Sequence, residues 1–381
     1  MTPSPEHRPT LALRALPRPV ALTGGRRLWL PLLALALVAL LAGCGTSRFA
    51  PKGWSGIALD GNDLYVGTGE GRIVLLEAED GREVWSYPPK DQDPLGPVYA
   101  PPLVANGTVI AATYSGRSDG KVVAIPARGE GQAWSLSIDG AIVGAPTLAD
   151  ETILLGSSDG HLYALDREFG ERLWRFPTGA KVWSPAAVEG GTVYFGSLDH
   201  RVYAVDLEDG SRLWSFETGG GVTGRPLISG GRVFVGSFDR NVYALDADSG
   251  SELWRTSMDQ WVWAGPVSDD SSIYVGTLGG SVYALRPETG LERWRTSVDG
   301  PILARPLLLN GSVAVATDSG RFHVLRRDSG TESWVFSVGE SVRANLVAQG
   351  DMVYMSTAEG SVRAVNAARG TTLWSKEKVG E

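Results

Sequence analysis

Few side chains in this sequence are of the types that perform covalent or metal chemistry. Cysteine occurs once, at Cys44, so no internal disulfide and no vicinal cysteine pair can form. The histidines are His7, His161, His200 and His323, and the last three occupy unrelated positions in the repeats described below. No two of them have the spacing of a metal site, and no nucleophile stands out beside a base. We therefore predict no catalytic residue and no resident metal.

The single cysteine follows a hydrophobic N-terminal segment. Residues 1–27 are rich in proline and arginine and end in Arg26-Arg27, and an apolar run of about 14 residues, Leu28–Leu41, comes next. This order is typical of an export signal, and the run is short for a transmembrane helix, which needs about 20 apolar residues. Leu41-Ala-Gly-Cys44 resembles the lipobox of bacterial lipoproteins, in which the cysteine is acylated and becomes the first residue of the mature chain.

The N-terminal region is therefore expected to hold a lipoprotein signal peptide at residues 1–43, a lipidation site at Cys44 and a tether over residues 44–53. The alternative is an uncleaved anchor with an incidental cysteine. Arg26-Arg27 leaves the twin-arginine export route open beside the general secretory route. Gly45 after the lipobox cysteine permits sorting to an outer membrane in a host that has one.

A tryptophan recurs at a nearly constant interval through the rest of the chain. Eight of the 13 tryptophans form this series, and from the second onward the spacing is 40: Trp85, Trp134, Trp174, Trp214, Trp254, Trp294, Trp334 and Trp374. Each interval contains four short apolar runs separated by turn sequences such as Asn106-Gly107. Such a period is typical of a β-propeller. We expect an all-β fold over residues 54–381, an eight-bladed propeller of four-stranded antiparallel blades.

The eight repeated tryptophans are predicted to be structural. A large amphipathic ring at one fixed position per blade suits packing between neighbouring blades, and its truncation to alanine should cost about 3–5 kcal/mol. The sequence leaves open whether each repeat forms one whole blade or a swapped strand closes the ring.

Departures from the repeat gather where one blade leads to the next. Two insertions, within Tyr87–Val98 and Thr113–Asp119, fall on the face that carries these links. Six residues outside the repeat pattern are expected on the same rim, near the mouth of a central channel: Trp183, Trp261, Trp263, Arg225, Arg305 and Arg343. Because tryptophan and arginine commonly anchor binding hot spots, we predict a partner-binding rim. The alternative is that the tryptophans only fill the channel and the arginines pair with local acids.

The charge of the chain argues against nucleic acid as a partner. The whole chain carries a net charge of −8, and without residues 1–43 there remain 30 basic and 42 acidic residues, a net of −12. A phosphate backbone requires a basic footprint.

The repeat itself resembles a known family. Ala244-Leu-Asp246, Ser249-Gly250 and Trp254 reproduce the tryptophan-docking pattern of quinoprotein-type (PQQ-dehydrogenase-like) propellers, and Ala164–Trp174 and Ala204–Trp214 match it too. The resemblance covers residues 54–381 and implies the fold more strongly than any activity. It also implies an alternative, a PQQ-dependent dehydrogenase or a PQQ- or ligand-binding propeller. The large alcohol dehydrogenases of that family need a cysteine pair and a Ca²⁺ site. A chain with a single cysteine cannot form the cysteine pair.

Calcium candidates are confined to acidic turns, Asp91-Gln-Asp93 and Asp269-Asp270, and acids in turns are more often simply solvated. We expect no cofactor and no enzymatic activity. Lipobox, short tether and eight repeats together resemble the BamB family of outer-membrane assembly lipoproteins. That resemblance implies a lipid-anchored scaffold of the bacterial envelope whose partners are envelope proteins, including a β-barrel insertase complex. In a single-membrane host the alternative is a surface-anchored peptide-binding or adhesion module.

Overall fold

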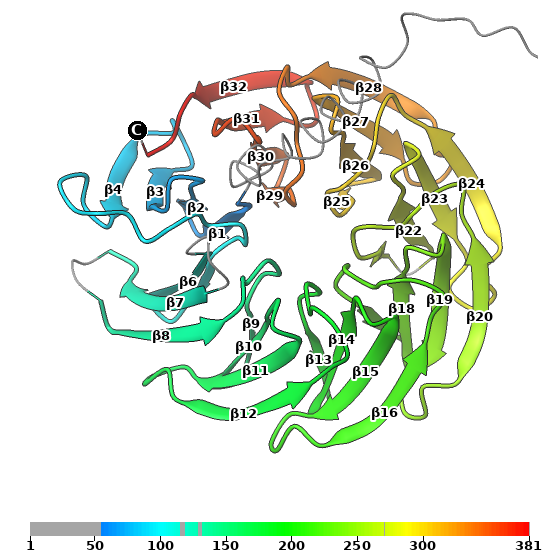
Figure 1. Cartoon of the computed structure of the whole chain (residues 1–381). Coiled ribbons are helices and arrows are strands. Elements are labelled where there is room, and N and C mark those ends of the chain that lie inside the picture. Colours follow the sequence, from blue (N-terminus) through cyan, green and yellow to red (C-terminus); the bar gives the residue numbers. More distant parts are fainter. Residues whose placement is uncertain (1–54, 115–118, 129–131, 270, 381) are drawn as a thin grey trace, which may run out of the picture. The chain divides into compact units, whose positions relative to one another are not determined.

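The computed structural model describes residues 55–114, 119–128, 132–269 and 271–380. The chain divides into two units, Met1–Ala50 and Pro51–Glu381. The first unit, which contains the predicted lipidation site Cys44, lies outside the described residues. The second unit consists of eight four-stranded sheets arranged as blades around a common centre (Figure 1). The predicted all-β, eight-bladed propeller of antiparallel blades is confirmed. None of the described segments forms a helix with the length and apolar character to cross a membrane.

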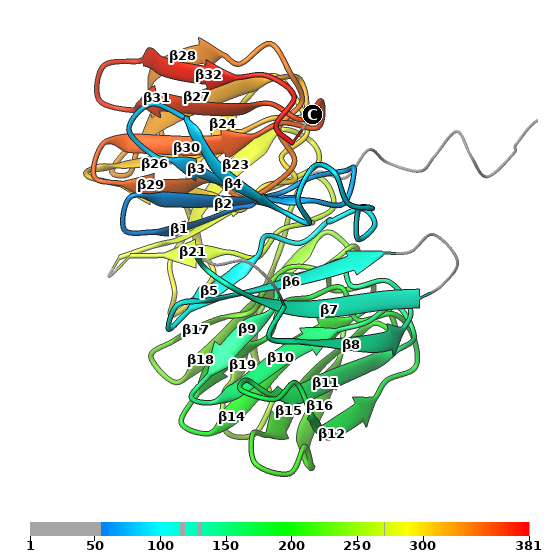
Figure 2. The ribbon, with the colours of Figure 1, turned by 90° about the vertical axis from the view of Figure 1, so that its left-hand side faces the viewer.

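Every blade contains four consecutive strands, ordered from the centre outward as the chain runs (Figures 1 and 2). The innermost strands are β1 (Ile57–Asp60), β5 (Leu103–Ala105), β9 (Thr147–Ala149), β13 (Ala187–Glu189), β17 (Leu227–Ser229), β21 (Val267–Ser268), β25 (Leu307–Leu309) and β29 (Val347–Gln349). The second strands are β2 (Asp63–Gly67), β6 (Thr108–Tyr114), β10 (Thr152–Gly156), β14 (Thr192–Ser197), β18 (Arg232–Gly236), β22 (Ile273–Gly276), β26 (Ser312–Ala316) and β30 (Met352–Ser356).

The third strands are β3 (Ile73–Glu77), β7 (Asp119–Pro126), β11 (His161–Asp166), β15 (Arg201–Asp206), β19 (Asn241–Asp246), β23 (Ser281–Leu285), β27 (Arg321–Arg326) and β31 (Val362–Asn366). The outermost strands are β4 (Glu83–Tyr87), β8 (Trp134–Asp139), β12 (Arg172–Pro177), β16 (Arg212–Glu217), β20 (Glu252–Ser257), β24 (Glu292–Ser297), β28 (Glu332–Ser337) and β32 (Thr371–Lys376). Blades 1 to 8 are numbered here in chain order, from β1–β4 to β29–β32.

The second and third strands are apolar on both faces because both faces of a blade pack against neighbouring blades. Val233 and Val235 of β18 point to one side, and together with Tyr243 of β19 they join a buried cluster that reaches Tyr194 and Val202 of blade 4. Phe234, on the other face of β18, is also fully buried, in a cluster with blade 6. The core is therefore a series of layers between blades, with no single centre.

The repeated tryptophans lie in these interblade layers. The indole Nε1 of Trp214 in blade 4 donates a hydrogen bond of 2.8 Å to the carbonyl of Ala247 in blade 5. The ring covers Gly250, where φ is +71° and an added Cβ would lie 2.6 Å from the indole. Corresponding bonds to the next blade are made by Trp85, Trp134, Trp174, Trp254, Trp294 and Trp374. Trp334 makes no such bond to a described residue, and a Cβ on Gly370 would lie 3.4 Å from its ring.

The ring closes without a swapped strand. Trp374 of the last blade donates to the carbonyl of Ala78 in the first at 3.0 Å, and the hydroxyl of Ser356 donates to the carbonyl of Ser55 at 2.6 Å. Figure 1 shows the end of β32 beside blade 1. Of the two closures that the sequence leaves open, the structure has one repeat per blade, joined at the last interface by side chains.

Candidate functional site

One face of the propeller carries both the linkers between blades and the turns between second and third strands. In successive blades a backbone N–H of the turn donates a 2.9 Å hydrogen bond to a linker carbonyl: Leu198 to Lys181, Phe238 to Gly221 and Leu278 to Trp261. We call this surface the linker face.

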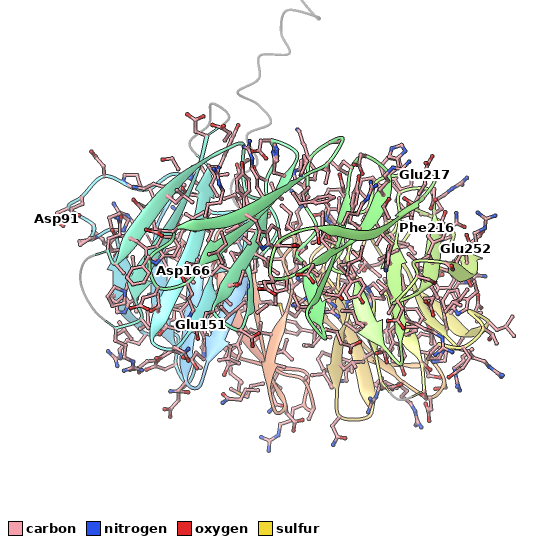
Figure 3. The ribbon with its side chains drawn as sticks, turned by 90° about the horizontal axis from the view of Figure 1, so that it is seen from below. Asp91, Glu151, Asp166, Phe216, Glu217 and Glu252 are labelled. Carbon is pink, nitrogen blue, oxygen red and sulfur yellow. The ribbon has the colours of Figure 1, made fainter. Side chains whose placement is uncertain are left out.

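The predicted insertion at Tyr87–Val98 belongs to the linker face as well. Its Leu95 bonds the carbonyl of Gly71 in the β2–β3 turn at 2.9 Å, and the Arg72 guanidinium donates to the carbonyls of Pro88 and Pro89 at 2.6 and 2.7 Å. Asp91 of the same insertion projects from its outer end (Figure 3). The second insertion, at Thr113–Asp119, lies partly outside the described residues.

A regular register connects turn and linker across this face. In three blades the second residue after the second strand contacts the linker residue 25 positions later. Ser158 accepts a 2.9 Å bond from the indole of Trp183, and Asp318 accepts a 2.6 Å bond from Nε of Arg343. At the same spacing Phe238 stacks on Trp263, with ring centroids 5.4 Å apart. One backbone geometry thus supports a polar bond, an ion pair and an aromatic contact in different blades.

The three rim tryptophans are part of a continuous aromatic stripe. Phe238 lies between Trp261 and Trp263, with centroid distances of 5.2 and 5.4 Å and interplanar angles of 18° and 23°. Trp263 then approaches Trp183 at 6.4 Å, and the Lys181 ammonium lies 5.4 Å from the Trp183 ring. Trp261 is 46% exposed, which is unusual for the largest side chain in a protein. The aromatic stripe, Trp183–Trp263–Phe238–Trp261, gives blades 4 to 6 an apolar patch on the linker face.

The three rim arginines divide into two kinds. Arg343 bonds Asp318, which Ser341 also bonds. Burial tends to raise the pKa of Asp318, but the bonds from Arg343 and Ser341 outweigh it and hold that pKa below its usual value. The sequence left open whether the rim arginines pair with local acids, and Arg343 does so.

Arg305 and Arg225 have no carboxylate partner among the described residues. The Arg305 guanidinium donates to the carbonyl of Pro266 through Nε at 3.0 Å and Nη2 at 2.8 Å. The side chain of Arg225 makes no hydrogen bond or ion pair to any residue that the structure describes. Both line a small cavity of about 120 Å³ at the centre of the linker face, together with Trp183 and Trp263.

This central cavity, which we call the mouth cavity, does not fit a PQQ cofactor. Sites for such ligands commonly have volumes of roughly 300–1,000 Å³. Here the linkers crowd the centre: a Cβ on Gly265 would lie 2.1 Å from the carbonyl oxygen of Arg225. A larger cavity of about 320 Å³ lies at the interface of blades 8 and 1, lined largely by small residues such as Gly67, Thr68 and Ser356.

The described histidines and acids do not form a metal site. Over the described ranges no three His, Cys, Asp or Glu side chains gather as ligands. His323 is buried, with Nε2 2.8 Å from Asp299 and Nδ1 3.0 Å from Glu332. It occupies the place where Tyr203 of blade 4 bonds Asp199 at 2.7 Å. The histidine thus ties the linker between blades 6 and 7 to β28 of blade 7, whereas the tyrosine holds the turn of its own blade.

Comparison with known proteins places the chain in a family. The family model described as outer membrane protein assembly factor BamB matches residues 20–125, 112–238, 170–260 and 238–377. This chain belongs to the BamB family. A BamB from Burkholderia pseudomallei is 35% identical over 81 residues, which cover 21% of this chain and 19% of that protein. The aligned part therefore spans about a fifth of the relative.

Two solved structures have the same fold. BamB from Moraxella catarrhalis superposes with a TM-score of 0.71 at 17% identity, over 81% of this chain and 95% of that one. The computationally designed Ika8 protein gives 0.71 at 18% identity, over 82% and 96%. A natural protein and a designed one are equally similar, so the likeness concerns architecture alone.

Proposed function

We propose that this protein is a lipid-anchored, non-enzymatic scaffold of the bacterial envelope that takes part in outer-membrane β-barrel assembly. Its partner would be a β-barrel insertase complex, and the lipid on Cys44 would hold it on the periplasmic side of the outer membrane. Membership of the BamB family supports the role. The observation on which the proposal rests is the exposed aromatic stripe on the linker face, with Trp261 at its outer end.

The stripe has the properties of a protein-binding surface. Its rings are stacked and held in place by each other, so ordering them on binding costs little conformational entropy. Tryptophan is among the residues most often found as energetic anchors of interfaces. Over the described ranges no three His, Cys, Asp or Glu side chains gather as metal ligands, which favours a scaffold over a metalloenzyme.

The partner is tested by affinity purification of the tagged full-length lipoprotein from native membranes after mild crosslinking. We expect recovery of a β-barrel insertase and its accessory lipoproteins. Trp261→Ala should reduce that recovery at least about tenfold, because a hot-spot truncation costs about 2 kcal/mol or more. Since nearly half of the ring is exposed, the melting temperature should change little.

The matched control is Leu213→Ala, which removes another exposed apolar side chain (52%) from the outermost strand of blade 4. It should leave recovery unchanged. Full recovery by Trp261→Ala, or equal loss in both variants, would contradict a binding role for the stripe.

The anchor is tested separately. Cys44→Ser should release the protein from the membrane fraction, because the hydroxyl cannot carry the thioether-linked lipid. The measurement is the distribution between soluble and membrane fractions. A variant that stays in the membrane fraction would show that residues 1–43 are an uncleaved anchor.

A further inference from the structure

The centre of the linker face concentrates positive charge that no described acid neutralises. Arg225 and Arg305 both line the mouth cavity, whereas Arg343, the third arginine of its lining, is bound to Asp318. This occurs in a chain with a net charge of −8, where carboxylates outnumber cations. Ten of the 22 described arginines form ion pairs with an acid, so this site is set apart by the presence of two unpaired arginines in one cavity.

The two arginines flank one short segment of backbone. Gly265 packs against the carbonyl of Arg225, and the next residue, Pro266, accepts both bonds from Arg305. Proline has no N–H to offer, and its carbonyl is used by Arg305. Asn345 further fixes Arg305 by accepting a 2.8 Å bond from its backbone N–H. The Arg305 guanidinium is thus held in place with Nη1 uncommitted, and Arg225 is uncommitted altogether.

The surroundings raise the free energy of both charges. Arg225 is open to solvent on the side of the mouth, but protein atoms crowd its other sides, and this burial lowers its pKa. Burial, and then the neighbouring charge of Arg225, lower the pKa of Arg305 to about 10. Two like charges that repel each other in a partly desolvated cavity are stabilised by any anion placed between them.

We infer that the mouth cavity is a carboxylate-binding site for an acidic segment of a protein partner. One carboxylate lies between Arg225 and Arg305, and the adjoining apolar side chain of the segment lies against Trp183 and Trp263. The inference deepens the proposed function, on which it rests, by giving the chemistry of the partner.

The shape of the cavity selects this ligand. A volume of about 120 Å³ accepts a carboxylate and a few atoms beyond it. The forked donors of a guanidinium match a carboxylate in geometry and charge. The aromatic stripe begins at the cavity wall and continues outward through Trp263 and Phe238, so a segment that enters the mouth has an apolar path across blades 5 and 6. The negative charge of the remaining surface repels acidic segments, which confines them to the mouth.

The test is fluorescence anisotropy with the full-length protein in detergent micelles. The probe is a fluorescein-labelled, C-terminally amidated heptapeptide, Gly-Ser-Asp-Phe-Asp-Ser-Gly, and its control has asparagine in place of both aspartates. We expect the acidic peptide to bind roughly tenfold or more tightly than the control, because it alone forms charge-assisted hydrogen bonds. Arg225→Gln should remove this preference, and Arg172→Gln, which changes an exposed arginine of β12 outside the cavity lining, should retain it.

Several outcomes would overturn the inference. They are equal binding of both peptides at millimolar concentration, or an equal effect of Arg225→Gln and Arg172→Gln. Displacement of the peptide by phosphatidylglycerol vesicles, but not by unlabelled acidic peptide, would assign the site to a lipid headgroup instead. If Arg225→Gln lowers the melting temperature, Arg225→Lys serves in its place and should keep part of the preference.

The peptide assay contains no insertase, so it separates the inference from the proposed function. Loss of the peptide preference with intact insertase recovery would refute the carboxylate site alone. Intact preference without insertase recovery would refute the proposed partner alone.

Discussion

Two rings of side chains run round the propeller with one residue from each blade or link, and they differ in nearly every respect. The docking ring contains the repeated tryptophans, of which Trp254 is representative: its Nε1 donates to Pro287 at 2.9 Å and its ring covers Gly290. The mouth ring consists of the residues nine positions after the docking tryptophans Trp134 to Trp334. They are Val143, Trp183, Thr223, Trp263, Leu303 and Arg343. Trp263, nine positions after Trp254, contacts mainly other aromatic rings of the linker face.

The same residue type therefore has two roles only nine residues apart, one in strand β20 and one in the linker that follows it. A position that meets the same neighbour in every blade is fixed by that neighbour, and its side chain is the same throughout. A position of the mouth ring meets a different turn residue from blade to blade, such as Ser158, Phe238 or Asp318, so its side chain differs as well. Uniformity fits the structural role of the docking ring, and variety in the mouth ring is what the binding site that we propose requires.

The largest effect should follow from removing a docking tryptophan. Trp174→Ala leaves a cavity between blades 3 and 4 and an unbonded carbonyl at Leu207, so we expect a loss of about 3–5 kcal/mol in the free energy of unfolding. Chemical denaturation measures it. Leu173→Ala, next to it and 53% exposed, should change stability by less than about 0.5 kcal/mol. Equal effects would remove the distinction between docking and other positions.

Substitution of the glycines that the docking tryptophans cover should show which interface between blades is packed least tightly. Gly330 and Gly370 both have positive φ, +70° and +65°, and alanine there costs about 1–2 kcal/mol in either case. At Gly330 a Cβ would also lie 2.5 Å from Trp294, whereas at Gly370 the nearest atom of Trp334 is 3.4 Å away. Gly330→Ala should therefore cost a further 1–3 kcal/mol or so, measured by denaturation of both variants. A larger loss for Gly370→Ala would show that the joint of blades 7 and 8 is as tight as the others.

The smallest effect concerns the one ion pair of the mouth ring. The bonds from Arg343 and Ser341 hold the pKa of Asp318 below its ordinary value of 3.8 in the folded protein. A carboxyl group whose pKa is lowered by folding stabilises the folded protein at pH values above its pKa in the unfolded chain. This stabilisation is lost as the pH falls through its pKa in the folded protein. Asp318→Asn should thus cost about 1 kcal/mol at pH 7 and progressively less below about pH 4. Urea denaturation at pH 7 and pH 3 measures the difference, and a constant difference would contradict the ion pair.

The sequence predicted the docking ring and the blades because each repeat restates the same local requirements. The glycine four residues before the tryptophan, as in Gly210 and Trp214, is required both by its positive φ and by the ring that covers it. Ring closure was not predictable, since a swapped strand and a whole-repeat blade use the same strands and bury the same faces.

The site was predictable only in part. The six rim residues could be assigned to one face because they occupy linker positions. Phe238 was missed because an apolar residue beside a strand end resembles strand sequence. The signal was the constant spacing of 25 from turn to linker, which also pairs Asp318 with Arg343. Arg225 and Arg305 stand eleven residues after their docking tryptophans, and Arg343 stands nine after, so the sequence already separated the paired arginine from the unpaired ones.

Closure by side chains alone determines when the ring can form as the chain folds. Trp174 meets Leu207 33 residues further along the chain, but Trp374 meets Ala78 across 296 residues. Loop entropy grows by about 0.6 kcal/mol for each doubling, so the last joint costs about 2 kcal/mol more than an ordinary one. Every other sheet and interface is complete once one further repeat is free to fold. The blades can therefore form in order as an open arc, and only the meeting of β32 with blade 1 requires the last repeat to reach the first.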